Sequence, residues 1–290
     1  MTAIYERELD SQLNGLTGYV YGALMLLFGG IYVMAIHLEG AIDFTTVLYS
    51  LTFIYLIGIP LLTMRSVAEE RHQKTDQLLY SLPLSMTKIV LGKYFALVTV
   101  LAMPLAVLSL YPPVVNALAS SGAIPMKAAY GAMAGFLFLG MALAAIGLFI
   151  SSLMESVGLA AGACFLVMLL LYFLTPLTGY LSSSAPASLI AFGVTALLLG
   201  VVLWRMTKNG GFALAFTGVL EGALGVCYAL FPKKFGGLFA DVIGQLAVFD
   251  RFDSFTYDIF DIRSLVYYVT VAAVFLFLTV QSMERRRWAS

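Results

Sequence analysis

Residues with the chemistry for catalysis or metal binding are few in this chain, and they are scattered. The only histidines are His37 and His72, so a zinc site or proton relay built on histidine is not expected. The chain has no G-x-x-x-x-G-K-[ST] loop to cradle nucleotide phosphates, and its Gly92-Lys93 pair is followed by tyrosine. No Ser/His/Asp arrangement is suggested either. We predict that the chain is no enzyme by itself and binds no metal or cofactor.

One acidic residue lies inside an apolar run. Glu221 is near the middle of the segment 212–230, and an ionisable residue at membrane depth is costly and often functional. It could couple transport to protons or sodium, or be protonated or hydrogen-bonded to a neighbouring helix for structural reasons; the sequence leaves both open. Cys164 and Cys227 also lie in apolar runs, and we expect both to be small buried hydrophobic residues.

The composition indicates what kind of scaffold positions these residues. Of the 290 residues, 61% are apolar and 11% are charged, whereas a soluble domain carries about 25% charged residues. This leaves too little polar surface to cover a water-soluble globule. We therefore predict an all-α polytopic membrane protein, forming one transmembrane domain over residues 1–290. The net charge is zero, and no basic patch indicates a nucleic-acid partner.

Eight segments are apolar over about the 20 residues that a transmembrane helix requires. They are residues 18–37, 45–64, 94–115, 128–151, 157–176, 189–204, 212–230 and 265–283. The sixth and seventh are the weakest, and only a short polar connection joins them. We expect these two segments to form one tight helical hairpin, residues 189–230.

The distribution of Lys and Arg predicts the orientation. With the N-terminus in the cytoplasm, 11 of the 16 basic residues fall on the cytoplasmic side and 5 on the other, as the positive-inside rule requires. An even number of spans then places both termini in the cytoplasm.

Two segments outside the spans are predicted to lie along the membrane surface. Residues 1–17 are predicted to form a short interfacial helix with apolar side chains such as Ile4 toward lipid, although the sequence also allows a frayed tail. Residues 231–263 form an extracytoplasmic segment. Within it, apolar residues recur at helical spacing from Phe235 to Phe249 and indicate an amphipathic helix.

Small residues four apart occur in three of the spans. They are Gly131 and Gly135 leading to Gly140 and Ala144, then Gly158 and Gly162, then Gly218 and Gly222. This spacing lets helix backbones approach closely, at a dimer or gating seam or in packing within one chain. We favour packing within the chain, because eight helices must pack against each other somewhere.

The longest polar stretch of the first half, residues 65–93, joins the second and third spans on the predicted cytoplasmic side. Glu70 and Lys74 have the spacing of a favourable i,i+4 pair on one helix. Pro83 cannot sit inside a continuing helix, and Ser85 is a good N-cap for a second helix that leads into the third span. The predicted arrangement is two helices with an apolar turn between them, although the sequence alone equally allows a plain solvated loop.

This stretch resembles the corresponding loop of ABC-2 type permeases, most of all the branch related to the gliding-motility permease. The resemblance consists of an acidic run, a threonine, paired leucines, a Leu-Pro turn and a Gly-Lys pair entering the next helix. The matching residues are Glu69, Glu70, Thr75, Leu78, Leu79, Leu82, Pro83, Gly92 and Lys93. Lys74 stands where the family often has glycine, so the first helix is expected to run unbroken here.

Residues 5–8, 146–161 and 251–288 also resemble the family. Members commonly have six spans, so the resemblance implies a six-helix core to which the hairpin 189–230, carrying Glu221, is added.

The resemblance implies a permease subunit of an ATP-binding cassette transporter, an exporter in the plasma membrane of a prokaryote. Separate ABC ATPase subunits would hold ATP and Mg, and a second permease copy or related membrane subunit would complete the complex. The residues implied to couple to the ATPase are Glu69, Glu70, Arg71, Thr75, Leu78, Leu79, Leu82, Pro83 and Leu84. Two alternatives are an ion-coupled secondary transporter built on Glu221 and a non-transporting membrane anchor or scaffold.

Overall fold

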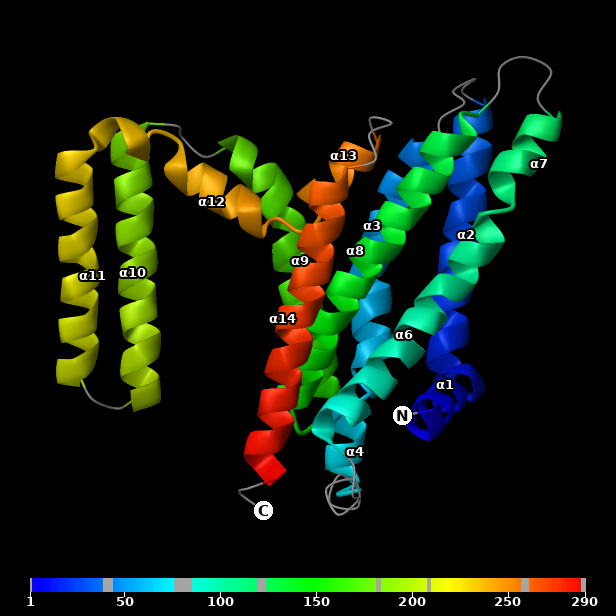
Figure 1. The fold of residues 1–290 in the computed structure, drawn as a ribbon, viewed down its shortest axis with the longest axis horizontal. Coiled ribbons are helices and arrows are strands. Elements are labelled where there is room, and N and C mark those ends of the chain that lie inside the picture. The colour runs from blue at the N-terminus through cyan, green and yellow to red at the C-terminus, as the bar shows by residue number, and fades with distance from the viewer. Residues whose placement is uncertain are drawn as a thin grey trace. The chain divides into compact units, whose positions relative to one another are not determined.

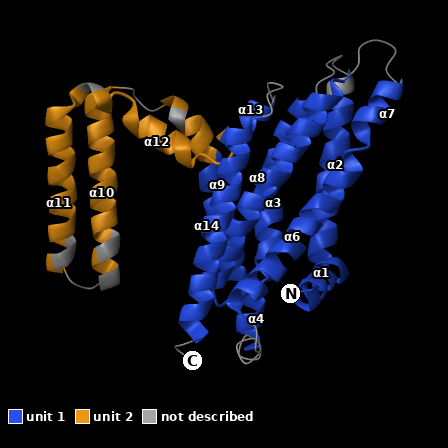
Figure 2. Cartoon of the chain, in the orientation of Figure 1, with its two compact units in different colours: residues 1–172, 251–290 blue, residues 173–250 orange. Residues whose placement is uncertain are grey.

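The structure, a computed structural model, describes residues 2–38, 44–75, 85–118, 124–180, 184–207, 210–256 and 261–287, and all regular elements in these ranges are helices. This confirms the predicted all-α class. The chain divides into two compact units, residues Met1–Tyr172 with Arg251–Ser290 and residues Phe173–Asp250 (Figure 2). That one permease domain covers the whole chain stays a prediction.

The first unit is a bundle of long apolar helices (Figure 1). Its elements are α1 (Thr2–Asn14), α2 (Leu16–Leu38), α3 (Phe44–Thr63), α4 (Ala68–His72), α6 (Met86–Leu108), α7 (Tyr111–Leu118), α8 (Met126–Leu153), most of α9 (Val157–Tyr180), α13 (Asp253–Thr256) and α14 (Ile262–Arg287). The central helix is α8, which packs against α3, α6 and α14. The polar helix α1 packs against α6 and α2.

Six helices in the described ranges are long and apolar enough to cross a membrane. They are Leu16–Ala35, Phe44–His72, Met86–Ala117, Met126–Leu153, Val157–Leu177 and Ile262–Arg287. These correspond to the first five predicted spans and the eighth, so the protein is a multi-pass membrane protein. The other two predicted spans overlap the shorter apolar helices Ala185–Val201 and Leu214–Leu230. The eight-span count and the cytoplasmic termini stay predictions.

The second unit contains the predicted hairpin. Its elements are the end of α9, α10 (Ala185–Thr207), α11 (Gly210–Leu230), the 3-10 turn η1 (Pro232–Phe235) and α12 (Leu238–Leu246). Helices α10 and α11 pack side by side, and a Cβ atom built on Gly200 would collide with the side chain of Thr217. Glycine is therefore needed where the two helix backbones come closest.

The amphipathic helix predicted from Phe235 to Phe249 is shorter in the structure. Gly237 has φ 76°, a left-handed conformation that glycine adopts without steric cost. It separates the turn η1 from α12, which covers only Leu238–Leu246. The predicted helix is confirmed for Leu238–Leu246. Near the start of the segment, Gly236 and Gly237 interrupt the helix.

Glycines on α8 make room for aromatic side chains in the first unit. A Cβ atom on Gly135 would lie 2.7 Å from the Phe255 ring, and one on Gly140 would lie 2.7 Å from the Tyr55 hydroxyl. Tyr55 stacks on Phe136 at 4.4 Å and donates a hydrogen bond to its carbonyl oxygen. The small residues of this span therefore serve packing within the chain, as predicted.

The other small-residue pairs do not show this packing. Cβ atoms on Gly158, Gly162, Gly218 and Gly222 would meet nothing within 4 Å. The preference for packing within the chain is thus confirmed for α8 alone.

Candidate functional site

The candidate site is the turn between α3 and α6, because there the most charged part of the sequence meets the bundle. Helix α3 ends at Thr63, a tight turn follows, and the short helix α4 begins at Ala68. The residue before α4, Val67, has no side chain that can cap a helix. The cap comes instead from α8, where the Ser151 hydroxyl accepts hydrogen bonds from the backbone N–H groups of Val67 (3.3 Å) and Ala68 (3.2 Å). These are two of the amides that a helix start leaves without partners.

A second contact ties α4 to the connection between α8 and α9. Arg71 is buried, and its guanidinium donates a hydrogen bond to the carbonyl oxygen of Met154 at 3.3 Å. Arg286 of α14 reaches the same connection, pairing with Glu155 at 3.4 Å. The short linker after α8 is therefore held by α4 and by the last helix.

The C-terminus of α4 corrects one expectation from the sequence. The helix does not run on past residue 73, because Lys74 adopts a left-handed conformation with φ 57°. The backbone N–H of Lys74 bonds to the carbonyl of Arg71, and that of Thr75 bonds to the carbonyl of Glu70, which together form a Schellman motif. Glycine suits the left-handed position best. The helix therefore ends before Lys74, and the expectation that it runs unbroken past this residue is wrong.

Buried charges connect α4 to α6 and α1. The side chain of Lys93 is 1% exposed. Its ammonium group lies 2.9 Å from a carboxylate oxygen of Glu8 and 2.9 Å from one of Glu70. It also donates a hydrogen bond to the carbonyl of Ser66 at 2.6 Å. Arg7 reaches the same oxygen of Glu70 from the solvent side. The predicted i,i+4 pairing of Glu70 with Lys74 is replaced by these contacts.

The buried network is balanced in charge. Glu8, Glu70, Lys93 and Arg7 contribute two negative and two positive charges, and the Ser66 hydroxyl donates a further hydrogen bond to Glu8 at 3.0 Å. Buried charges are tolerated when they are paired and hydrogen-bonded in this way. We call these four charged residues, together with Ser66, the Lys93 network.

The residues predicted to couple to an ATPase have different surroundings. Glu70 and Arg71 face into the protein, and the Thr75 hydroxyl donates to the carbonyl of Glu70. Glu69 is partly exposed and lies 4.0 Å from Arg65. The remaining predicted residues, Leu78, Leu79, Leu82, Pro83 and Leu84, lie outside the described residues.

Five residues of the site are not recognised as such in the sequence. Glu8 and Lys93 are noted there only within short motifs, and Arg7, Ser66 and Ser151 are not noted as site residues at all. One usable signal was present: a lysine inside a helix that continues as an apolar span requires a carboxylate partner. The sequence did not indicate which of its 16 acidic residues supplies that partner.

Glu221 and the cysteines lie elsewhere. Glu221 is exposed on the surface of α11, on the side where its carboxylate lies near Gly193 of α10. Cys164 is buried, as expected, whereas Cys227 on α11 is exposed, so the expectation of burial is wrong for that residue. Among the described residues, no group of three or more His, Cys, Asp or Glu side chains is placed to hold a metal ion.

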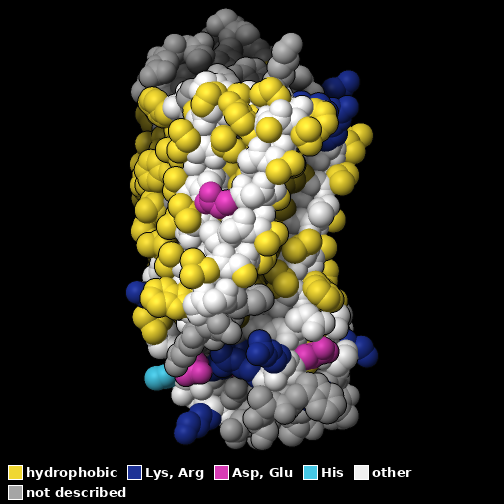
Figure 3. All heavy atoms as spheres, turned by 90° about the vertical axis from the view of Figure 1, so that its left-hand side faces the viewer, with side chains coloured by type: hydrophobic (Ala, Val, Ile, Leu, Met, Phe, Trp, Pro, Cys, Tyr) yellow, Lys and Arg dark blue, Asp and Glu magenta, His cyan; other side chains and the backbone are white. Residues whose placement is uncertain are grey.

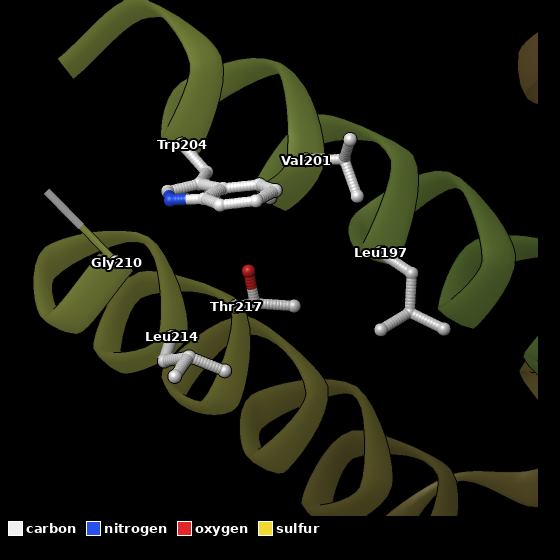
Figure 4. A pocket seen from close by; sticks show the side chains of 7 residues that line it. Leu197, Val201, Trp204, Gly210, Leu214 and Thr217 are labelled. Carbon is white, nitrogen blue, oxygen red and sulfur yellow. The ribbon is translucent and has the colours of Figure 1, made fainter. Parts of the chain in front are cut away.

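An apolar pocket of about 410 Å³ lies between α10 and α11. Its walls include Leu197, Val201, Trp204 and Leu214, and the Thr217 hydroxyl points into it (Figure 4). Most of the face shown in Figure 3 likewise carries hydrophobic side chains, with Lys and Arg gathered toward its ends. None of the described residues that line the pocket is charged, and they offer an apolar surface.

The chain is a helical multi-pass membrane protein. Its long apolar helices pack around the charged turn between α3 and α6, which buried ion pairs hold against the bundle. The chain belongs to the ABC-2 family transporter proteins, whose family pattern matches residues 3–234. This family forms the membrane component of ABC transporters and is not itself catalytic. Its members work with ABC ATPases and often form dimers.

The match ends before the predicted resemblance at 251–288, and it does not test the gliding-motility branch. No curated protein matches the chain.

Proposed function

We propose that the chain is the permease subunit of an ABC exporter in the plasma membrane of a prokaryote, driven by separate ATPase subunits that grasp residues 65–93. Both termini then lie in the cytoplasm with this loop. The membrane subunit is dimeric, formed by two copies or by one copy and a related chain. ATP and Mg are held by the ATPases.

The observation that carries this proposal is the set of contacts made by α4. This helix of five residues is bonded to α8 through Ser151, to the α8–α9 connection through Arg71, and to α6 and α1 through Glu70. A displacement of α4 therefore displaces several helices together. A solvated loop without these contacts could change its conformation without moving the bundle.

The surface left for a partner lies on the same turn. His72, Gln73 and Lys74 are exposed, while Glu70 and Arg71 are turned inward. We propose that Glu69 and the exposed residues contact the ATPase together with five apolar residues, Leu78, Leu79, Leu82, Pro83 and Leu84. Glu70 and Arg71 then act by holding α4 in place.

The proposal is tested by purifying the tagged chain from its native membranes. The expected result is a co-purifying protein with a phosphate-binding G-x-x-x-x-G-K-[ST] loop, and ATP hydrolysis by the complex in proteoliposomes. Recovery of the chain without an ATPase, with flux that collapses when the proton or sodium gradient is removed, would favour the ion-coupled alternative built on Glu221. Partner binding without any flux would favour the anchor.

Variants of the loop test its assignment. Leu79→Asp and Pro83→Asp each place a charge among the apolar residues that we propose to contact the ATPase. Because a buried interface charge costs more than about 1.4 kcal/mol, we expect at least about a tenfold loss of ATPase binding. Membrane insertion should be unchanged. The matched control is Lys127→Asp, a position outside the loop at the start of α8. Full ATPase binding and transport in both loop variants would contradict the assignment.

A further inference from the structure

The buried face of α1 is polar, although α1 has the length and position of an ordinary surface helix. Its buried residues are Ile4, Glu8 and Gln12, one turn apart from each other. A helix that only rests on lipid buries apolar side chains and exposes its charges. A carboxylate and a carboxamide on the inner face indicate instead that α1 is docked by specific hydrogen bonds.

Those hydrogen bonds lead to the start of the candidate site. Gln12 donates to the carbonyl of Leu62 at 3.2 Å, in the last turn of α3, and accepts one from Thr17 at 3.2 Å. Carbonyl groups in the last turn of a helix have no partner within it, so α1 supplies one from outside. Glu8 then accepts from Ser66, in the turn that leads directly into α4.

Glu8 and Glu70 share one cation. Both carboxylates contact the Lys93 ammonium at 2.9 Å, so the position of Glu70 on α4 depends on a charge that Glu8 also holds. Arg7, the neighbour of Glu8 on α1, contacts Glu70 directly. Helix α1 and helix α4 are thus joined through the Lys93 network as well as along the chain.

We propose that α1 moves together with α4 when the ATPase acts on the loop 65–93. In this proposal Glu8 is a positioning residue, which acts through Lys93 to fix α4 where it contacts the ATPase. The proposal rests on the proposed function. When the ATPase displaces α4, α1 moves with it as one body. Because α1 leads directly into α2, the displacement then reaches the first span in addition to α3 and α6.

The experiment compares Glu8→Gln with Glu6→Gln in the complex purified with its ATPase. Both changes remove one carboxylate from α1, but Glu6 is exposed and has no part in the Lys93 network. Spin labels on two exposed positions, Ser11 of α1 and Arg65 in the turn before α4, report the distance between α1 and the start of α4 without altering the residues proposed to contact the ATPase. It is measured without nucleotide and with ATP and vanadate, and ATP hydrolysis by the same samples is recorded.

In the wild type and in Glu6→Gln, the label distance should be the same in both nucleotide states. In Glu8→Gln the distribution of label distances should broaden or shift with ATP and vanadate. The rate of ATP hydrolysis by the complex should change at least twofold. Glu8→Asp, which keeps the charge, should restore the fixed distance. This rescue separates positioning by charge from a general loss of folding, which Tm measurements on each variant monitor.

Each outcome has a consequence. A label distance that changes with nucleotide in the wild type, or one that stays fixed in Glu8→Gln, overturns the inference and leaves the proposed function standing. A wild-type chain that binds no ATPase overturns the proposed function, and the inference fails with it.

Discussion

Replacing Lys93 by methionine tests the Lys93 network most directly. The change roughly keeps the length of the side chain but leaves Glu8 and Glu70 without their shared cation, and their side chains are 8% and 14% exposed. Removing one partner of a buried ion pair costs about 3–5 kcal/mol. Glu8 keeps the Ser66 hydroxyl and Glu70 keeps Arg7, so we expect the lower end, about 3 kcal/mol, or about two decades in the unfolding equilibrium constant.

The assay is unfolding of the detergent-solubilised protein by sodium dodecyl sulfate, followed by circular dichroism. A triple variant, Glu8→Gln with Glu70→Gln and Lys93→Met, is the decisive control. It removes the three inward-facing charges and leaves only the exposed Arg7, and replacing buried ion pairs by neutral residues is often close to neutral in stability. The triple variant should therefore recover most of the loss. The reasoning is refuted if Lys93→Met unfolds within about 1 kcal/mol of the wild type, or if the triple variant is no more stable than Lys93→Met.

The same assay checks three further predictions. Gly140→Ala puts a methyl group 2.7 Å from the Tyr55 hydroxyl and should cost about 1–3 kcal/mol. Its control, Gly162→Ala, meets nothing within 4 Å and should be neutral or stabilising by up to about 1 kcal/mol; equal effects would contradict the packing described for α8. Lys74→Gly relieves the left-handed backbone and should stabilise by about 0.5–1 kcal/mol, so a destabilised variant would count against the Schellman motif. A hydrogen bond from the backbone N–H of Arg263 holds the pKa of Asp261 below its usual value. The stabilising effect of this carboxylate at the start of α14 should therefore be complete above the ordinary carboxyl pKa and disappear as the pH falls through the lowered value. The stability difference between the wild type and Asp261→Asn should vanish at that pH, and a constant difference would show that the charge of Asp261 does not stabilise the start of α14.

Local patterns in the sequence predicted the helices well. The first five spans and the last were visible as apolar runs of the right length. The spacing of Gly135 and Gly140 predicted a close helix contact, and the number of helices to be packed favoured a contact within the chain. These features depend on residues close together in the chain. The helix end at Lys74 could not be predicted from the local sequence, because the left-handed conformation is rare for lysine. It is identified by the hydrogen bonds to the carbonyl groups of Arg71 and Glu70.

The contacts of the candidate site could not be predicted in the same way. Lys93 lies 85 residues from Glu8 in the chain, and nothing local distinguishes Glu8 from the nearby Glu6. Which of the two faces the bundle depends on how α1 rotates against α6. The inward turn of Glu70 and Arg71, beside the partly exposed Glu69, depends in the same way on packing against α8 and α6.

The hydroxyl of Ser151 gives the charged loop a place in the order of synthesis. It caps backbone amides that precede it by 83 and 84 residues, so α4 leaves the ribosome well before its cap does. A helix of five residues without a cap of its own is not stable alone. The helix that we propose to contact the ATPase is therefore completed only after α8 has inserted beside α3. An ATPase that recognises α4 would bind assembled bundles and pass over chains still being inserted.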